Sequence, residues 1–171
     1  MPCVVADTSP LFYLAKLDRL TLLRELYQSV NVPEVVWRET LAATEKHPEI
    51  LPTLTAARSD GWLIVSRLHL PHALPGLGML DAGEREAIEL ANELHADLLI
   101  VDDEAGRNAA AKLGFSVTGT LGVLISAKQS GLLATLKPEI ERLCSETTFR
   151  ISPGLKSTAL RRAGESTIQL P

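Results

Sequence analysis

Aromatic residues and cysteines are scarce in this chain. Phe, Trp and Tyr make up 4% of its 171 residues, and the two cysteines are Cys3 and Cys144. With so few aromatic side chains, base stacking is not expected to be the main source of any affinity for nucleic acid. The cysteines match no metal-ligand spacing, so we expect both to be reduced residues of the core.

Long apolar runs are also missing. No run approaches the ~20 residues that a bilayer-spanning helix needs, and Asp7 interrupts the first apolar stretch before it resembles a signal segment. These absences argue against a membrane protein and favour a cytoplasmic one. A length of 171 residues with 46% hydrophobic residues suits one domain with a full core.

The net charge of −4 argues weakly against bulk binding of nucleic acid, but it conceals an asymmetry. Residues 1–103 hold 8 Lys/Arg and 16 Asp/Glu, whereas residues 104–171 hold 9 and 5. An acidic half followed by a basic one fits a metal site beside a surface for a polyanion. The alternative is a set of solvated basic side chains with no such role.

The stretch Leu98-Leu99-Ile100-Val101 predicts a strand buried on both faces, as in a parallel sheet covered by helices. Shorter strands are expected at 3–6, 30–32, 62–65 and 115–118, each followed by a helical pattern. This alternation predicts an α/β fold with a largely parallel sheet. Residues 149–152 are expected to form a last strand and 155–163 a terminal helix.

Acidic residues follow two of these strands directly. Asp7 ends the first strand, and Asp102 and Asp103 end the central one. Because parallel strands place their carboxyl ends at one edge, these acids should meet there, in the crevice where α/β sheets bind ligands. Glu84 begins the helix that leads into the central strand, and Glu39 lies in the helix after the second one. Oxygen donors without His or Cys suit Mg²⁺ or Mn²⁺, and such ions support hydrolysis of phosphodiesters.

Each acid also has a purely structural interpretation. Asp7 suits a helix N-cap, Asp103 or Glu104 the start of a helix, and Glu84 a capping box with Asp81. Glu39 suits a surface ion pair. These alternatives stay open on the sequence, although they do not account for two strand-end acids in an apolar core.

In several ordered segments the sequence resembles the PIN domain, the fold of the VapC toxins, and within it a poorly characterised prokaryotic PIN-like subgroup. The matching segments are Val4-Val5-Ala6-Asp7-Thr8-Ser9, Val32-Pro33-Glu34-Val35-Val36-Trp37-Arg38-Glu39, Leu80-Asp81-Ala82-Gly83-Glu84, Leu99-Ile100-Val101-Asp102-Asp103 and Gly119-Thr120-Leu121-Gly122. Each segment is short, but their order over residues 3–150 makes the set fairly specific.

This resemblance implies a three-layer α/β/α sandwich, a homodimer and an acidic pocket in which Mg²⁺ or Mn²⁺ supports RNA hydrolysis. It implies that the function is that of the toxin ribonuclease of a type II toxin–antitoxin system, partnered by a cognate antitoxin. The residues carried over as catalytic are Asp7, Glu39, Glu84, Asp102 and Asp103; all but Glu39 are expected to bind metal directly. Glu84 stands where many members have Asp, and of the adjacent pair we expect Asp102 to face the metal before Asp103.

Residues around these acids complete the hypothesis. Thr8 or Ser9 would orient a water, and Arg107 would either reach a phosphate or pair with a neighbouring carboxylate. Possible contacts to the RNA backbone are Lys128, Lys137, Arg150, Lys156, Arg161 and Arg162.

The predicted domain covers residues 1–150, followed by a C-terminal extension over 151–171 packed on the domain or on a partner. Two other functions remain open. One is a catalytically silent PIN-like module that binds a partner. The other is a haloacid-dehalogenase-like phosphotransferase, which needs a second Asp two residues after the first, where this chain has Ser9.

Overall fold

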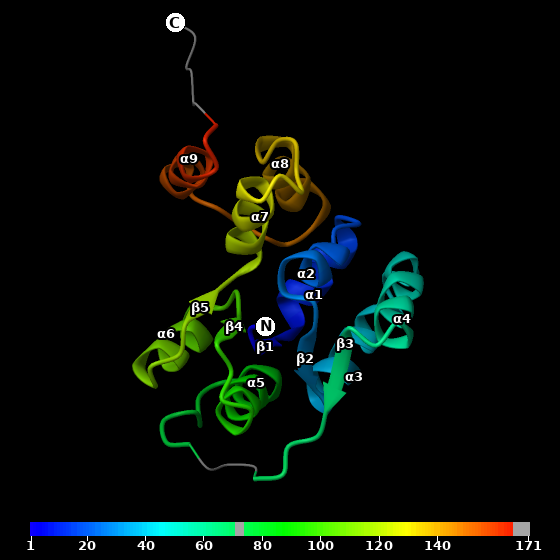
Figure 1. Ribbon diagram of the computed structural model, residues 1–171, viewed down its shortest axis with the longest axis vertical. Coiled ribbons are helices and arrows are strands. Elements are labelled where there is room, and N and C mark those ends of the chain that lie inside the picture. The colour runs from blue at the N-terminus through cyan, green and yellow to red at the C-terminus, as the bar shows by residue number, and fades with distance from the viewer. Residues whose placement is uncertain (71–73, 166–171) are drawn as a thin grey trace, which may run out of the picture.

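The computed structural model describes residues 1–70 and 74–165 (Figure 1). Within them one sheet contains β1 (Val4–Ala6), β2 (Val30–Pro33), β3 (Leu63–Ser66), β4 (Leu98–Ile100) and β5 (Val117–Thr118). The strand order is β3-β2-β1-β4-β5, and every pairing is parallel. The predicted parallel sheet is confirmed, and β3 lies at its edge.

Helices cover both faces of the sheet (Figure 1). One face packs against α5 (Ala82–Glu93) and α6 (Glu104–Lys112), the other against α1 (Thr8–Lys16), α2 (Thr21–Tyr27) and α7 (Thr120–Gln129). The other elements are α3 (Glu34–Ala43), the short 3₁₀ turn Pro48–Ile50, α4 (Leu51–Ser59), α8 (Lys137–Glu146) and α9 (Pro153–Arg162). The expected three-layer α/β/α sandwich is confirmed.

The strands alternate between two apolar clusters. Val4, Ala6 and Ile100 belong to the larger cluster, on the side of α1, α2 and α7. Val5 and Leu99 belong to the smaller one, with α5 and α6. Because both faces are covered, all three residues of β1 are fully buried, which explains the unbroken apolar runs.

The tips of β1 and β4 are tied together at the carboxyl edge. Ala6 pairs with Ile100, and the backbone N–H of Asp7 donates to the carbonyl of Ile100 at 3.0 Å. Since α1 begins at Thr8 and α6 at Glu104, the first turns of both helices lie at this edge. The expected meeting of the strand ends that carry Asp7 and Asp102 is therefore observed.

The C-terminal segment departs from the prediction. Residues 149–152 form no strand. The N–H of Phe149 donates to the Thr147 hydroxyl at 3.0 Å, and the Ser152 hydroxyl caps α9 by accepting from the N–H of Leu155. These local bonds make the chain turn instead of extending along the sheet. Helix α9 then packs on α7, where Gln129 donates to the carbonyl of Arg162 at 2.8 Å; residues 166–171 lie outside the described part of the chain.

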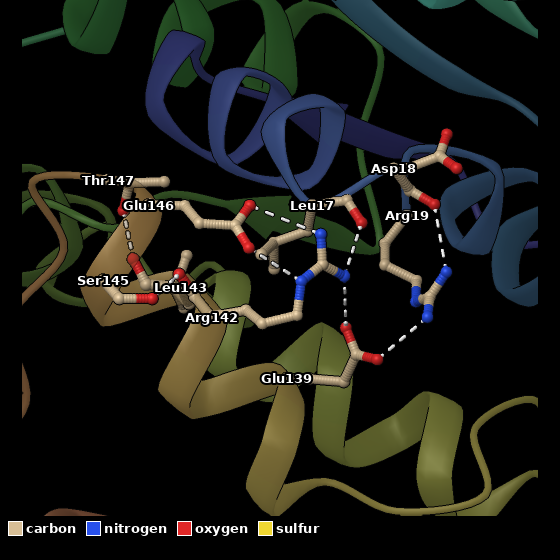
Figure 2. A network of polar contacts seen from close by, with 9 residues as sticks. All are labelled: Leu17, Asp18, Arg19, Glu139, Arg142, Leu143, Ser145, Glu146 and Thr147. Carbon is tan, nitrogen blue, oxygen red and sulfur yellow. Dashed lines mark hydrogen bonds and ion pairs between the residues drawn. The ribbon is translucent and has the colours of Figure 1, made fainter.

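A buried carboxylate fastens α8 to the turn between α1 and α2 (Figure 2). Glu139 is 7% exposed and lies 2.9 Å from an Arg19 nitrogen and 3.8 Å from an Arg142 nitrogen. Arg142 also donates to the carbonyl of Leu17 at 3.1 Å and forms an ion pair with Glu146. One acid between two guanidinium groups thus joins parts of the chain 120 residues apart.

The structure bears on the expectations for the cysteines and for membrane-spanning helices. Cys3 and Cys144 carry free thiols, as expected, but both are half-buried and not fully in the core. No helix among residues 1–70 and 74–165 has the length and apolar character needed to cross a bilayer.

Candidate functional site

Asp7 is a buried acid at the tip of β1. Its side chain is 4% exposed, and although it occupies the N-cap position of α1, its carboxylate makes no capping hydrogen bond. Burial, and then the charges of Asp81, Glu84 and Glu39, raise the pKa of Asp7 to about 7, while the Thr8 backbone N–H opposes this shift. Capping therefore does not account for this carboxylate, which is held among other acids.

Glu84 is the second buried acid, in the first turn of α5, and it is 7% exposed. It completes the predicted capping box: its N–H donates to Asp81 Oδ1 at 2.8 Å, and its carboxylate accepts from the Asp81 N–H at 3.4 Å. Burial and the charges of Asp81 and Asp103 raise the pKa of Glu84 to about 7. The structural interpretation is confirmed, yet the same carboxylate also shares an acidic neighbourhood.

Gly83 marks the point at which three oxygen atoms converge. A side-chain carbon on Gly83 would lie 2.6 Å from Glu39 Oε2, 3.1 Å from Asp7 Oδ1 and 3.3 Å from Thr8 Oγ1. The Thr8 hydroxyl also donates to Glu39 Oε2 at 2.6 Å. Glu39 is thus no surface ion-pair partner but joins α3 to the first turn of α1, and the missing Cβ at residue 83 gives these groups room.

Asp103 lies on the other side of Glu84 and acts as the N-cap of α6. Its carboxylate accepts from the N–H of Ala105 at 2.8 Å and of Gly106 at 3.4 Å. A side-chain carbon on Gly106 would lie 3.5 Å from the Glu84 carboxyl carbon, so Glu84 reaches toward the start of α6. The acids therefore follow one another across the beginnings of α1, α5 and α6, where the helix dipoles favour negative charge.

Asp102 forms its hydrogen bonds with Thr120 of α7 and not with the other acids. Its carboxylate accepts from the N–H of Thr120 at 2.8 Å and from the Thr120 hydroxyl at 2.6 Å. Burial raises its pKa, which these hydrogen bonds and the nearby positive charge of Arg107 counteract. We expected Asp102 to face the other acids before Asp103, whereas the observed contacts bring Asp103, and not Asp102, next to Glu84.

Arg107 lies with Asp102 at the tips of β4 and β5. It donates to the Val101 carbonyl at 3.4 Å, and its side chain is exposed. A side-chain carbon on Gly119 would lie 2.6 Å from Asp102 Oδ1 and 2.8 Å from an Arg107 nitrogen. We expected Arg107 to reach a phosphate or to pair with Asp103, whereas the carboxylate near it is Asp102.

Asp81 is a member of this site that the sequence did not single out. We expected it only to cap α5, but its charge contributes to the raised pKa of both Asp7 and Glu84. The signal was present in the capping box itself, because Asp81 and Glu84 must lie side by side to form it.

The basic residues proposed for RNA lie apart from the acids. Helix α7 begins at the strand tips with Thr120, so Lys128 in its last turn lies near the opposite end. Gln129 bonds to the Arg162 carbonyl, and the N–H of Lys137 donates to Glu165 at 3.0 Å, which brings these helix ends together. Two others have local partners: Arg150 donates to backbone carbonyls, and Lys156 pairs with Glu141 at 3.4 Å. Arg161 lies in the last turn of α9, beside Arg162.

The carboxylates suit a hard divalent cation by donor type and by charge. Burial, and then the charges of neighbouring acids, raise the pKa of Asp7 and Glu84, and a bound cation would stabilise their ionised forms. Within residues 1–70 and 74–165, however, no three His, Cys, Asp or Glu side chains are arranged to hold one ion. The fit therefore lies in the chemistry and charge of the donors.

Comparison with known proteins places this geometry in a family. The PIN domain family model matches residues 3–165. Among solved structures, a PilT N-terminus domain protein from the hyperthermophilic archaeon Sulfolobus solfataricus is similar, with 25% sequence identity, coverage of 72% of this chain and 92% of that one, and a TM-score of 0.49. A comparison with curated proteins gave no significant match. The family match spans nearly the whole chain and includes every acid described above, so the chain belongs to the PIN domain family, whose members are typically metal-dependent nucleases.

Proposed function

We propose that this protein is an endoribonuclease that uses Mg²⁺ or Mn²⁺ to hydrolyse phosphodiester bonds in RNA. The observation that carries the proposal is the gathering of buried acids at the starts of α1 and α5: Asp7 and Glu84 are 4% and 7% exposed, and Asp7 and Glu39 both face Gly83. Burial and the neighbouring acids raise the pKa of Asp7 and of Glu84 to about 7. Perturbed acids of this kind gather at functional sites. Membership of the PIN domain family favours a nuclease over the phosphotransferase alternative.

The residues that would hold the ion are Asp7, Glu84 and Glu39, with Asp103 beside Glu84. A bound divalent ion supplies an activated water and stabilises the charge that develops on the phosphate. Thr8 keeps Glu39 oriented through its 2.6 Å hydrogen bond. Thr120 fixes the direction of the Asp102 carboxylate through one hydrogen bond to each oxygen, which leaves a lone pair on each for the ion.

Ser9 and Arg107 have different places in this proposal. Ser9 follows Thr8 in the first turn of α1 and lines a neighbouring cavity, from which it can contact substrate. Arg107 is exposed at the strand tips and can bind a substrate phosphate. The basic residues at the far ends of α7 and α9 would contact only a longer RNA that reaches around the domain.

The experiment compares wild-type protein with Asp7→Asn. We expect wild type to bind Mn²⁺ in a calorimetric titration and to cleave single-stranded RNA, and we expect the variant to lose both. Lys112→Ala, which changes an exposed residue in the last turn of α6, is the control. Equal cleavage by wild type and Asp7→Asn would refute the site, since a contaminating nuclease would then account for the activity.

One observation favours a second candidate, the catalytically silent PIN module. In the described part of the chain, no three acids are arranged to hold one ion. This function predicts neither Mn²⁺ binding nor cleavage by the wild-type protein. The same titration therefore separates the two candidates.

The biological setting that we propose is a type II toxin–antitoxin system, with this chain as a homodimeric toxin acting in the cytoplasm. RNA binding is common among PIN domain proteins. Expression of the toxin should arrest bacterial growth, expression of Asp7→Asn should not, and a cognate antitoxin should co-purify with both. Growth unaffected by a wild-type protein that is active in vitro would exclude the toxin role while leaving the nuclease in place.

A further inference from the structure

A cavity of about 390 Å³ lies between α1 and α3, directly beside the acids. Three successive turns of α1 face α3 and the segment after it: Thr8 contacts Glu39, Phe12 packs on His47, and Lys16 pairs with Glu49. The cavity therefore extends from the acidic site along α1, and the four residues from Thr8 to Phe12 rise about 6 Å along the helix axis.

Aromatic rings are concentrated at this cavity. Phe12 and Tyr13 line it or border it, with ring centroids 5.8 Å apart, and Phe149 packs against Tyr13 at 5.6 Å. These are three of the seven Phe, Trp and Tyr residues in the chain. The Tyr13 hydroxyl is also within 3.2 Å of the Thr148 hydroxyl, which fixes this ring. A chain with few aromatic residues thus places a group of them next to its acids.

Small side chains of α3 form the wall of the cavity opposite α1, and Lys46 and His47 lie at its outer end. Ala42 and Ala43 of α3 form the wall, where their methyl groups leave open space. Lys46 and His47 follow the end of α3, and Lys46 is exposed. The cavity is therefore lined by rings and methyl groups, with acids near one end and the cationic Lys46 at the other.

We propose that this cavity binds one nucleoside of a single-stranded RNA, adjacent to the phosphate that a divalent ion at the acids would bind. The base lies against Phe12 and Tyr13, and the following backbone phosphate contacts Lys46. This inference deepens the proposed function and rests on it for the identity of the ligand. Stacking on aromatic rings and a cation for the backbone are the two elements by which proteins bind single strands. The volume lies in the range of small-molecule sites, and one nucleoside held beside the scissile bond would make cleavage depend on sequence.

The test measures binding separately from cleavage. In the Asp7→Asn background, a short RNA carrying one photoreactive 4-thiouridine is irradiated with the protein, and adducts are mapped by mass spectrometry. We expect adducts on Phe12, Tyr13 or His47. Phe12→Leu should weaken binding of the RNA about tenfold, whereas Phe115→Leu, the same exchange beside β5, should not. Lys46→Ala should lower the salt dependence of binding, and Lys112→Ala should leave it unchanged.

The possible failures can be told apart. Adducts in the cavity together with no cleavage by wild type would refute the nuclease and keep the nucleoside site. Cleavage by wild type, with adducts elsewhere and unchanged binding by Phe12→Leu, would refute the nucleoside site and keep the nuclease.

Discussion

Thr120 binds both carboxylate oxygens of Asp102: its N–H lies 2.8 Å from Oδ1 and its hydroxyl 2.6 Å from Oδ2. This pair joins the tip of β4 to the first turn of α7. Each oxygen accepts one hydrogen bond, so Thr120 fixes the direction of the Asp102 carboxylate while a lone pair on each oxygen stays available.

Replacing Thr120 by Val tests that contact. The change keeps the shape of the side chain and removes the hydroxyl donor, so we expect a loss of about 1–3 kcal/mol in the free energy of unfolding. Urea denaturation measures this loss. Thr135→Val, at an exposed loop position, is the matched control and should change stability by less than about 0.5 kcal/mol. An equal effect of the two exchanges would show that the Thr120 hydroxyl does not stabilise the fold.

The raised pKa values of Asp7 and Glu84 predict how stability depends on pH. In the unfolded chain these acids titrate near pH 4, whereas in the folded protein they titrate near pH 7. Between these values the folded state binds more protons, so both groups make stability fall as the pH rises from about 4 to 7. Asp7→Asn should therefore raise the melting temperature at pH 7.5, where folding must keep an ionised Asp7 buried. At pH 4 the folded protein holds Asp7 in its neutral form, so the exchange should have little effect there.

Adding and removing a metal ion should also change the melting temperature through these two acids. At pH 7.5 millimolar Mn²⁺ should raise the melting temperature of wild type, because a bound cation stabilises the ionised acids, and a chelator should reverse the rise. Asp7→Asn should respond less. A melting temperature that Mn²⁺ leaves unchanged in wild type would contradict a cation site at these acids.

Gly83→Ala tests the convergence of Asp7, Glu39 and Thr8. The added methyl would lie 2.6 Å from Glu39 Oε2, so this side chain must move, and we expect Mn²⁺ affinity and RNA cleavage to fall at least about tenfold. The helix itself should tolerate alanine, which has a higher helix propensity than glycine. Gly154→Ala changes the corresponding second residue of α9, where nothing lies within 4 Å, and it should keep full activity.

Glu139→Gln tests the contact that fastens α8 (Figure 2). Removing the charge leaves Arg19 and Arg142 facing each other without their shared partner, and we expect a loss of about 1–3 kcal/mol in the free energy of unfolding. Glu141→Gln on the same helix breaks only an exposed pair with Lys156 and should cost less than about 1 kcal/mol. RNA cleavage at a temperature where both variants are folded should equal that of wild type.

Much of the fold was readable because its determinants are local. The run from Leu98 to Val101 predicted a strand with two covered faces, and β4 is such a strand. The capping residues Asp81 and Glu84 predicted the start of α5. The strand predicted at residues 149–152 was wrong. Its apolar side chains, Phe149 and Ile151, pack on the core from an irregular segment, so their alternation does not require a strand.

The direction of each acidic side chain was not readable. Asp102 and Asp103 are neighbours beyond the end of β4, and a shift of one residue in the end of that strand exchanges the directions in which they point. The partner that holds Asp102 is Thr120, 18 residues further along the chain. Likewise, nothing in the spacing of Lys128, Lys137 and Arg162 revealed that they gather at the far ends of their helices, because that arrangement depends on how α7 and α9 pack.

The capping box of α5 gives Glu84 a second role, at a position where the resemblance implies Asp in many members of the family. In this box the Glu84 carboxylate returns to the Asp81 N–H at 3.4 Å. Glu84 therefore both caps the start of α5 and belongs to the group of acids, so replacing it would change helix stability and the charge of the site together. For an inactive but well-folded variant, Glu39 is the better position to change, since its carboxylate is bonded to a side chain and not to a helix end.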